Sequence, residues 1–591
     1  MKLQKKLAAL ARWLCAGGAL VLGQVCQGQV PAVGSVQSAA QAAIEQEQRI
    51  RQQQEARERA QTVDSPGVRA AVAAQTEFPT LSAETPCFRI ETFVLDVPAD
   101  LPAAVREQGA SELPQDPFAF ARAWLDHYQG SCIGKHGVDL LVKGVSQAVL
   151  DRGYVTSRVL VPEQDLSTGA LRLMLIPGVI GELRFAEPEL WGTWRSAFPT
   201  RGGNLLNLRD LEQGLEQMKR VASQDVDMQV VPTATPGVSD VVIAVKRSKR
   251  WTVVASVDDS GSRSTGKRQS NVSLAIDNPL GLNDLFNVGY SHDLEFGDKA
   301  RGTKGWNGFY SVPWGYWTAT LSAYGSDYFQ QVAGVNQTFV FSGESQNVDL
   351  KLHRVIRRSQ NDVLGLQWRL TRRFGKSYIE DTEIAQQRRN NTVAEFGITD
   401  RHYFGAAQLD ASLLYRQGVG GFGSQADTLA AQGGPTWQFK MAVADINLSV
   451  PFKLGQQSMR YVTTFRGQFT NDRLYFVDAI TIGSRYTVRG FDGENLLAGD
   501  RGFYWRNELQ LPVANTGQAL YAGLDYGRVF GPSTAALVGT QLAGAVLGLR
   551  GGVGTGLGAF SYDVFVGTPV YKPTAFHTAG VTGGFQLVYQ Y

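Results

Sequence analysis

The chain has 591 residues, of which 65 are glycine, and 10% of its residues are aromatic. Its 57 basic and 54 acidic residues leave a net charge of only +3, which argues against a dedicated nucleic-acid binder. A mean hydropathy of -0.16 excludes a bundle of hydrophobic helices. The length suits several domains or one large barrel with accessory modules.

Residues 1–28 have the features of a secretory signal peptide. Its positive end, apolar centre and cleavage-site residues are Lys2, Lys5 and Lys6, then Leu14–Leu22, then Cys26–Gly28. A retained membrane anchor would need a longer apolar run. A lipoprotein would carry aliphatic and small residues before its cysteine, and Gly23–Val25 does not match that pattern. The mature chain is therefore expected to begin near Gln29.

Cleavage would leave only two cysteines, Cys87 and Cys132. A cysteine pair in an exported chain indicates one disulfide formed in an oxidising compartment such as the bacterial periplasm. The alternative is a pair of unpaired buried thiols.

The mature N-terminal segment, residues 29–61, contains a stretch with helical composition and no apolar face. Ser38–Gln61 is rich in Ala, Gln, Glu and Arg, which favour helix. A helix that is polar all round is either exposed and frayed or enclosed by water, as in a pore. Residues 62–85 follow with the composition of a linker that would let such a helix move.

Between residues 86 and 250 the periodicity predicts two small α+β modules, 86–176 and 177–250. The first is expected to hold strands Phe88–Leu95, Val155–Val161 and Ala170–Ile176 with helices Pro117–Tyr128 and Val138–Asp151. The second is expected to hold strands Gly181–Phe185, Val226–Val231 and Ser239–Val245 with helix Leu208–Ser223. The two modules repeat a topology more than a sequence.

The helix of the second module begins with a recognisable motif, made of Asn207, Leu208, Arg209, Asp210, Leu211, Gln213 and Gly214. Asn207 is suited to cap the helix, and an early acid such as Asp210 is favourable at the positive helix end. Both modules also offer open sheet edges, which can take an extra strand from an extended peptide. Pairing of these edges with the neighbouring module is the alternative.

From residue 251 to 591 apolar and polar residues alternate throughout. In the last strand Phe585, Leu587, Tyr589 and Tyr591 fall on one face. A period of two with one wholly apolar face fits a transmembrane strand with lipid outside and water inside. A soluble sandwich would also alternate, but the length of the region, the signal peptide and the terminal aromatic residue favour a membrane β-barrel. Roughly 14 to 18 strands fit.

The turns of this barrel are expected to differ between its two ends. Short turns at residues 278–281 and 313–315 would lie on one side, and the longer polar stretches 379–391 and 417–434 on the other.

One stretch resembles a nucleotide-binding motif but departs from it at a required residue. Residues 261–267 match most of a phosphate-binding loop, but Arg268 replaces the magnesium-binding Ser or Thr and alternating strands flank the loop. The six histidines lack metal-ligand spacing and no nucleophile-base pair is legible, so neither a metal, a cofactor nor an enzymatic activity is expected. A protease or lipase site hidden in barrel loops is the alternative.

Together these stretches resemble a known family. The resemblance rests on Cys87–Phe88, Asn207–Leu215, Asp258–Gly261, Asp277–Asp284 and Val488–Phe491. It is to the two-partner secretion transporters (the TpsB family, of the haemolysin and filamentous-haemagglutinin exporter type) within the BamA-like superfamily, and it covers essentially the whole mature chain. The family most often has Tyr where this chain has Phe491, a change that keeps the ring and loses a hydroxyl.

The resemblance implies two periplasmic POTRA domains, a 16-stranded antiparallel barrel in the Gram-negative outer membrane, and an N-terminal helix lodged in the pore. It also implies type V secretion of a large exoprotein, an adhesin, haemolysin or contact-dependent toxin, recognised through its N-terminal secretion domain and threaded unfolded. Because the periplasm lacks ATP, folding of the cargo outside is the expected source of direction. Other expected partners are outer-membrane lipids, lipopolysaccharide and the barrel-assembly machinery.

Two other functions remain open on the sequence. An assembly insertase usually carries more periplasmic modules, and a passive porin would not need them.

The resemblance further implies a site inside the barrel. The loop with Val488, Arg489, Gly490 and Phe491 is expected to fold back into the pore, where its arginine meets an acid of a G-x-D-x-G-like strand. Gly523–Gly527 matches that pattern, so Asp525 is the expected partner. Such a pair is geometrically specific and strongly destabilising to break when desolvated. The alternative is that water wets the two groups separately.

Overall fold

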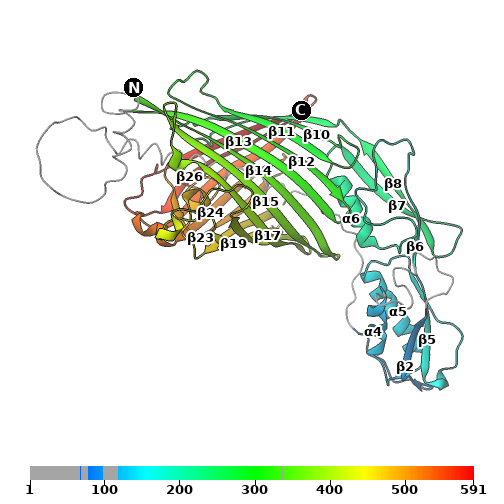
Figure 1. Cartoon of the computed structure of the whole chain (residues 1–591). Helices are drawn as coiled ribbons and strands as arrows, with labels where there is room; N and C mark the ends of the chain where they lie inside the picture. The colour runs from blue at the N-terminus through cyan, green and yellow to red at the C-terminus, as the bar shows by residue number, and fades with distance from the viewer. Residues whose placement is uncertain (1–66, 68–77, 97–116, 334–337, 515) are drawn as a thin grey trace, which may run out of the picture.

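The structure is a computed structural model that describes residue 67 and residues 78–96, 117–333, 338–514 and 516–591. The expected signal peptide (1–28), the expected pore helix (38–61) and most of the expected linker (62–85) lie outside these residues. The described chain forms a barrel with two small modules at one end (Figure 1).

The first module is a three-stranded sheet covered by two helices. Its elements are β1 (Phe88–Arg89), β2 (Thr92–Asp96), α4 (Ala119–Asp126), β3 (Cys132–Ile133), α5 (Lys135–Asp151), β4 (Arg158–Leu160), η1 (Leu166–Thr168) and β5 (Ala170–Ile176). The sheet order is β2-β5-β4, and its core includes the fully buried Leu125, Leu141 and Leu173.

The expected strand over residues 88–95 is interrupted, because the chain changes its pairing partner there. β1 pairs with β3, whereas β2 pairs in parallel with β5. Between them the Glu91 amide donates to the Gly169 carbonyl. At the start of β1 a disulfide joins Cys87 to Cys132, with their Cα atoms 5.4 Å apart, which confirms the predicted bond.

The second module has the same kind of layout. Its elements are β6 (Val179–Phe185), α6 (Leu208–Lys219), β7 (Gln224–Pro232) and β8 (Val238–Arg247), with sheet order β6-β8-β7. The expected helix over 208–223 is too long: α6 ends at Lys219 because two tight turns, from Val221 to Met218 and from Gln224 to Val221, lead directly into β7. In the described residues the two module sheets are separate, so their edges do not pair with each other.

Asn207 connects the two modules. Its side chain accepts a bond from the Arg209 amide at 2.8 Å, as the predicted helix cap. Its amide group also donates to the Arg152 carbonyl, and the Leu208 amide donates to the Gly153 carbonyl just after α5. The cap of α6 thus rests on the end of the first module.

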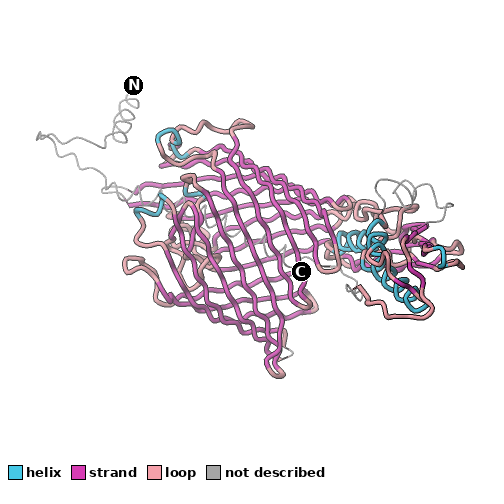
Figure 2. The backbone as a smooth tube through the Cα atoms, turned by 90° about the horizontal axis from the view of Figure 1, so that it is seen from below, coloured by secondary structure: helices cyan, strands magenta, loops and turns pink. Residues whose placement is uncertain are grey.

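Residues 251–591 form a closed barrel of sixteen antiparallel strands in the described part of the chain (Figure 2). They are β9 (Trp251–Asp258), β10 (Gln269–Asp277), β11 (Leu285–Asp293), β12 (Arg301–Trp314), β13 (Trp317–Ala333), β14 (Thr338–Arg358), β15 (Asp362–Ile379), β17 (Arg389–Phe404), β18 (Ala407–Val419), β19 (Lys440–Leu454), β20 (Gln457–Thr470), β23 (Arg501–Val513), β24 (Gln518–Phe530), β25 (Gln541–Thr555), β26 (Gly558–Tyr571) and β27 (Thr582–Gln590). A two-residue strand, β16 (Thr382–Glu383), extends β15. β27 pairs with β9 and closes the ring.

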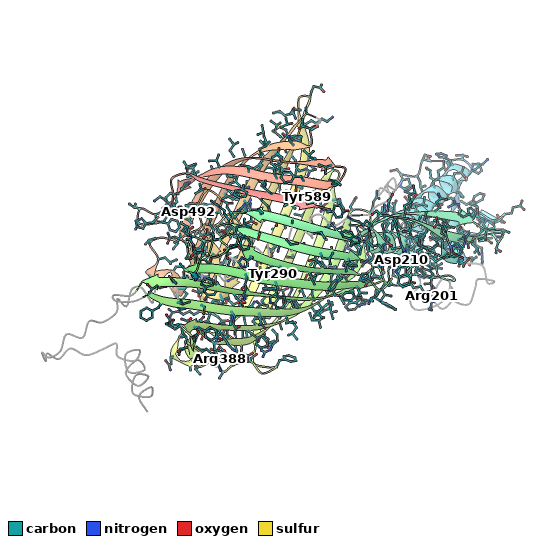
Figure 3. All side chains as sticks on the ribbon, turned by 90° about the horizontal axis from the view of Figure 1, so that it is seen from above. Arg201, Asp210, Tyr290, Arg388, Asp492 and Tyr589 are labelled. Atoms are coloured by element: carbon teal, nitrogen blue, oxygen red, sulfur yellow. A yellow bond between two sulfur atoms is a disulfide. The ribbon has the colours of Figure 1, made fainter. Side chains whose placement is uncertain are left out.

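The barrel has an apolar outside and a charged inside, as the alternation predicts. Tyr290 and Tyr589, both exposed, lie on the outer surface (Figure 3). Buried ion pairs occupy the inner face, for example Arg401 with Asp410 at 2.7 Å. This is the pattern of a strand wall between lipid and a polar interior. Across the described ranges, no helix combines the length and the apolar character that crossing a membrane requires.

The turns divide between the two barrel ends as expected. The β10–β11 and β12–β13 turns contact the second module, through Gly281 with Thr193 and Gly315 with Ser196. The longer connections after β15 and β18 lie at the opposite end. The apparent phosphate loop connects β9 to β10 and so has strands on both sides.

Candidate functional site

The longest described connection in the barrel, residues 471–500, is here called the pore loop. It joins β20 to β23 and carries η4 (Phe476–Asp478) and a small hairpin of β21 (Ile480–Ile482) and β22 (Leu497–Gly499). Asp492 in this loop and Asp210 in α6 mark opposite ends of the barrel (Figure 3).

Arg489 of the pore loop is bound to Asp525 of β24. Its Nε and Nη2 atoms donate to the two carboxylate oxygens at 2.7 and 2.9 Å, and its backbone amide donates at 3.0 Å. Asp525 is fully buried and Arg489 is 6% exposed. Direct contact, and not separate wetting by water, therefore holds the two groups in this structure.

A second acid, Glu508 of β23, was not expected from the sequence. Its carboxylate accepts from Arg489 Nη1 at 2.6 Å and from Arg550 of β25 at 2.9 Å. Glu508 lies on the inward face of its strand, opposite Gly523 in the register. The guanidinium of Arg489 is thus held by two carboxylates from neighbouring strands, which fixes both its position and its plane.

Four inward-facing glycines make room for the pore loop. A Cβ on Gly544 would lie 1.9 Å from the Arg489 carbonyl oxygen, and one on Gly523 would lie 2.6 Å from Arg489 Nη2. Gly527 and Gly567 approach Val488 and Gly490 at 2.8 and 2.9 Å in the same way. The two glycines of the G-x-D-x-G pattern are therefore explained by the close approach of the loop to the wall.

The residues on either side of Arg489 anchor the loop by apolar contacts and backbone shape. Val488 is fully buried and Phe491 is 5% exposed. The ring of Phe491 meets Phe576 edge-on, at 5.9 Å between centroids. Phe491 packs in an apolar cluster, so a phenylalanine is accommodated there without the tyrosine hydroxyl that the resemblance leads us to expect. Gly490 has φ +97, and a Cβ there would lie 2.5 Å from the Thr568 carbonyl.

Three further contacts tie the pore loop to neighbouring segments. Arg485 Nη1 donates to Asp259 at 2.8 Å, just after β9. Asp492 accepts from the Ala579 amide at 3.0 Å, in the connection between β26 and β27. Arg373 of β15 binds Asp478 at the base of the loop at 2.6 Å. The loop is therefore held from several sides of the wall.

The helix motif of the second module forms a junction with the barrel. The hydroxyl of Tyr316, in the β12–β13 turn, donates to Asp210. Gln213 and Gln217 both donate to the Gly315 carbonyl, at 3.2 and 3.3 Å. Burial raises the pKa of the Asp210 carboxyl, and the Tyr316 hydroxyl partly offsets this.

Arg358, at the end of β14, completes the junction. It is buried and donates to Gln213 at 2.9 Å and to Glu216 at 2.5 Å. Gly214 lets the helix approach Phe198, since a Cβ there would lie 2.2 Å from the ring. Leu211 is fully buried in the module core. The motif thus serves both the module's own fold and its attachment to the barrel.

The β10–β11 turn, residues 278–284, binds the other side of the second module. Asn283 donates to the Thr193 carbonyl at 2.7 Å, and Ser196 donates to the Leu282 carbonyl at 2.7 Å. Arg220, just after α6, lies near Asp284, and burial lowers its pKa to about 10. The stretches that carry the family resemblance therefore gather at this junction and at the pore loop, apart from Cys87–Phe88.

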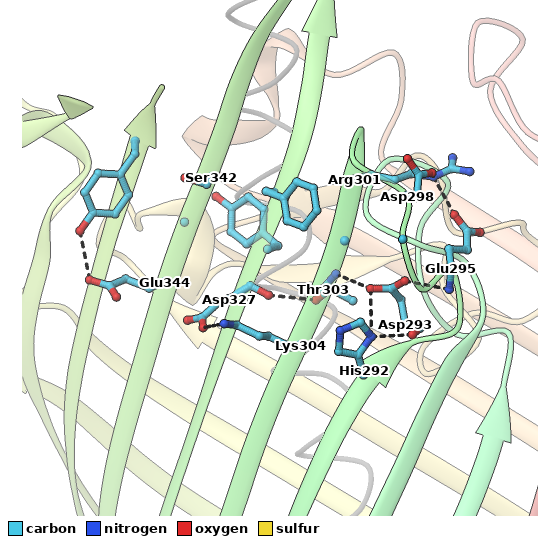
Figure 4. A pocket seen from close by; sticks show the side chains of 16 residues that line it. His292, Asp293, Glu295, Asp298, Arg301, Thr303, Lys304, Asp327, Ser342 and Glu344 are labelled. Carbon is cyan, nitrogen blue, oxygen red and sulfur yellow. Dashed lines mark hydrogen bonds and ion pairs between the residues drawn. The ribbon is translucent and has the colours of Figure 1, made fainter. Parts of the chain in front are cut away.

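A separate cavity of about 460 Å³ lies between the ends of β11 to β15 that point away from the two modules (Figure 4). Its two cations are each paired with a carboxylate, Lys304 with Asp327 at 3.4 Å and Arg301 with Glu295 at 2.7 Å, and the Tyr378 hydroxyl donates to Glu344 at 3.2 Å. In the part of the chain that the structure describes, no three His, Cys, Asp or Glu side chains form a metal-binding group. The cavity therefore holds a network of ion pairs and hydrogen bonds.

Comparison with known proteins identifies the architecture. The family model described as haemolysin secretion/activation protein ShlB/FhaC/HecB matches residues 237–551. Two POTRA-domain models match residues 103–178, the ShlB type, and 179–232. The two modules are thus POTRA domains.

Curated relatives match along most of the chain. The outer membrane transporter CdiB-2 of Burkholderia pseudomallei is 63% identical over 95% of this chain and 96% of its own length. The outer membrane transporter CdiB of Dickeya dadantii is 30% identical over 78% of this chain and 81% of its own.

A solved structure agrees with the fold. The structure of CdiB from Acinetobacter baumannii superposes with a TM-score of 0.79 at 26% identity, covering 95% of this chain and all of the other. Because the family match covers residues 237–551 and the relatives match along most of the chain, POTRA domains included, the chain belongs to the ShlB/FhaC/HecB family of haemolysin secretion/activation proteins.

Proposed function

We propose that this protein is an outer-membrane transporter that takes a large partner exoprotein from the periplasm through its POTRA domains and secretes it unfolded through its barrel. The observation that carries the proposal is the pore loop bound to the inner wall through Arg489, Asp525 and Glu508. A barrel that only needed to be open would not require a loop held inside it. Its relatives are transporters by name.

We expect the cargo to be of the class that CdiB-type transporters secrete, ahead of a haemolysin. The relative at 63% identity is named CdiB-2, whereas the haemolysin transporter HpmB of Proteus mirabilis is 26% identical over 64% of this chain. Similarity over nearly the full length, POTRA domains included, favours a cargo of the same class.

Recognition of the cargo is assigned to the open edges of the POTRA sheets. In the first domain the edge strand β4 and its neighbour expose Leu160, Val161 and Met174. In the second, the edge strand β7 exposes Val230 and Val231. An unfolded chain can add to such an edge through backbone hydrogen bonds, with apolar side chains beside it for selectivity.

The remaining steps of the proposal combine the observed junction with the sequence and the family resemblance. The junction of α6 with the β12–β13 and β10–β11 turns sets the second POTRA domain at the periplasmic mouth. The polar helix over residues 38–61 plugs the resting pore, and the signal peptide over 1–28 directs export. Folding of the cargo outside the cell gives the direction.

Lipid and lipopolysaccharide surround the apolar outer face, and the barrel-assembly machinery inserts the chain. The outward aromatic residues of the last strand support this. Tyr591 packs against Trp251 at 5.5 Å, and Lys249 lies over both rings, at 3.6 and 4.1 Å.

The test is secretion of the partner exoprotein, for which a very large open reading frame beside this gene would be the first candidate. A deletion strain should retain that exoprotein in the periplasm, and the wild-type transporter should restore it to the cell surface. Surface display without the transporter would overturn the proposal. For the plug, a variant lacking residues 38–61 should raise single-pore conductance in planar bilayers, and unchanged conductance would remove that part.

A further inference from the structure

The seam between the first and last barrel strands follows a regular ladder over most of its length. β9 and β27 pair from Val254 with Gln590 to Asp258 with Gln586. Val253 exchanges both backbone hydrogen bonds with Tyr591, at 3.2 and 2.9 Å. Hydrogen-bonded pairs recur at every second residue of an antiparallel ladder, so the same register makes residues 259 and 585 such a pair.

At that position the Phe585 amide donates to a side-chain carboxylate, and not to the backbone carbonyl of residue 259. The Phe585 amide donates to Oδ1 of Asp259 at 3.0 Å. β9 ends at Asp258, whereas β27 runs on to Thr582 at the end away from the POTRA domains. The extracellular end of the seam therefore depends on the position of one carboxylate.

That carboxylate is held by the pore loop. Arg485 Nη1 donates to the same Oδ1 atom at 2.8 Å. The side chains of Arg485 and Asp259 are only 21% and 13% exposed, so salt screens their attraction less than that of a surface pair.

The guanidinium of Arg485 packs against an aromatic ring of the wall. It lies over the ring of Phe565 in β26, at 5.1 Å from the ring centre. Phe565 in turn lies across Gly584 of β27, where a Cβ would come within 2.3 Å of the ring. Phe565 and Gly584 are direct partners in the ladder. Arg485, the Phe565 ring and β27 are therefore packed together beside the Phe585 amide.

The arginines at 485 and 489 lie on one short, internally bonded turn, in which the Thr487 amide donates to the Ser484 carbonyl at 3.1 Å. One arginine binds the wall at β23 and β24 and the other binds the seam. We propose that Arg485 is a positioning residue that locks the extracellular end of the β9–β27 seam to the pore loop, so that this end loosens when the loop withdraws. The proposal goes beyond the transport function and rests on contacts within the resting barrel.

Disulfide trapping in the full-length chain tests it without any cargo. The pairs Ser256 with Val588 and Val254 with Gln590 lie on the same face of the seam, nearer the extracellular and the periplasmic end respectively. Both are non-hydrogen-bonded pairs, in which the two Cα atoms lie about 4.5 Å apart. This distance suits a disulfide and is the same for both pairs. The mature chain's own cysteines are already joined to each other.

Each cysteine pair is combined with Arg485→Ala or Arg485→Lys, and only inserted, heat-modifiable barrels are scored. Arg485→Ala is expected to slow cross-linking of the 256/588 pair about two- to fivefold while leaving the 254/590 pair unchanged. Arg485→Lys is expected to restore part of the rate, because it keeps the charge. Equal rates for the 256/588 pair with and without Arg485, or an equal loss at both pairs, would overturn the proposal. Secretion is measured separately, so failure of the transport function would not produce either result.

Discussion

Arg489 and Asp525 form a buried bidentate ion pair in which two guanidinium nitrogens and one backbone amide of the loop converge on a single carboxylate. Removing either partner would leave the other charge desolvated, which costs about 3–5 kcal/mol for buried pairs. The pair is therefore the main contact that anchors the pore loop to the barrel wall.

The two carboxylates around Arg489 are expected to contribute unequally. Asp525 accepts three bonds from Arg489, whereas Glu508 accepts one and is also bound to Arg550. Asp525→Asn should therefore release the loop more than Glu508→Gln does. Limited proteolysis of the loop in inserted barrels measures this release. Equal protection in the two variants would contradict the assignment.

A side chain added at Gly544 is expected to displace the loop from inside the wall. The space is already filled by the Arg489 carbonyl, so Gly544→Val must push the backbone of the loop away. Gly554→Val on the same strand is the matched control, since a Cβ at Gly554 meets nothing within 4 Å. Gly544→Val should lower secretion strongly and the control should not. Comparable secretion by both variants would show that the close approach has no role.

The POTRA junction should depend on pH through Asp210. Burial raises the pKa of its carboxyl, so the folded junction binds the proton more tightly than the unfolded chain. The stability of the junction is then highest below the ordinary carboxyl pKa and falls as pH rises through the raised value. Asp210→Asn keeps an acceptor for Tyr316 and removes the charge. It should flatten the pH dependence of the POTRA thermal transition in the detergent-solubilised full-length chain; an unchanged slope would contradict this.

Reduction of the Cys87–Cys132 bond should destabilise the first POTRA domain alone. The bond closes a loop with a sequence separation of 45, for which chain entropy gives about 4 kcal/mol. A Cys87→Ser, Cys132→Ser double variant should lower the thermal transition of the POTRA domains and leave the heat-modifiable migration of the barrel unchanged. A variant with wild-type transitions would show that the bond contributes no stability.

The fold was predictable from the sequence because its signals are local. Alternation over residues 251–591 indicates a barrel, and the hydrophobic periodicity from 86 to 250 indicates two α+β modules. The errors lie at element ends, where tertiary contacts decide. The chain switches from β3 to β5 between Arg89 and Thr92, and α6 turns into β7 after Lys219.

The site was predictable only in part. Asp525 is marked by its two flanking glycines, and the family resemblance pairs it with Arg489. No flanking sequence pattern points to Glu508, although the alternation along β23 predicts that its side chain faces inward once the strand is known. The contact of Asp259 with Phe585 and Arg485 could not be predicted, because barrel closure alone brings together residues 226 and 326 positions apart.

Secretion of the partner exoprotein by an Arg489→Ala transporter tests the role of the docked pore loop. Arg528→Ala is the matched control, since Arg528 lies exposed on the strand that carries Asp525. At equal amounts of inserted, heat-modifiable barrel, Arg489→Ala should reduce the exoprotein at the cell surface by about tenfold or more, as expected for the loss of a buried ion pair, while Arg528→Ala should secrete normally. Wild-type secretion by a fully inserted Arg489→Ala barrel would show that the docked pore loop is not required for transport.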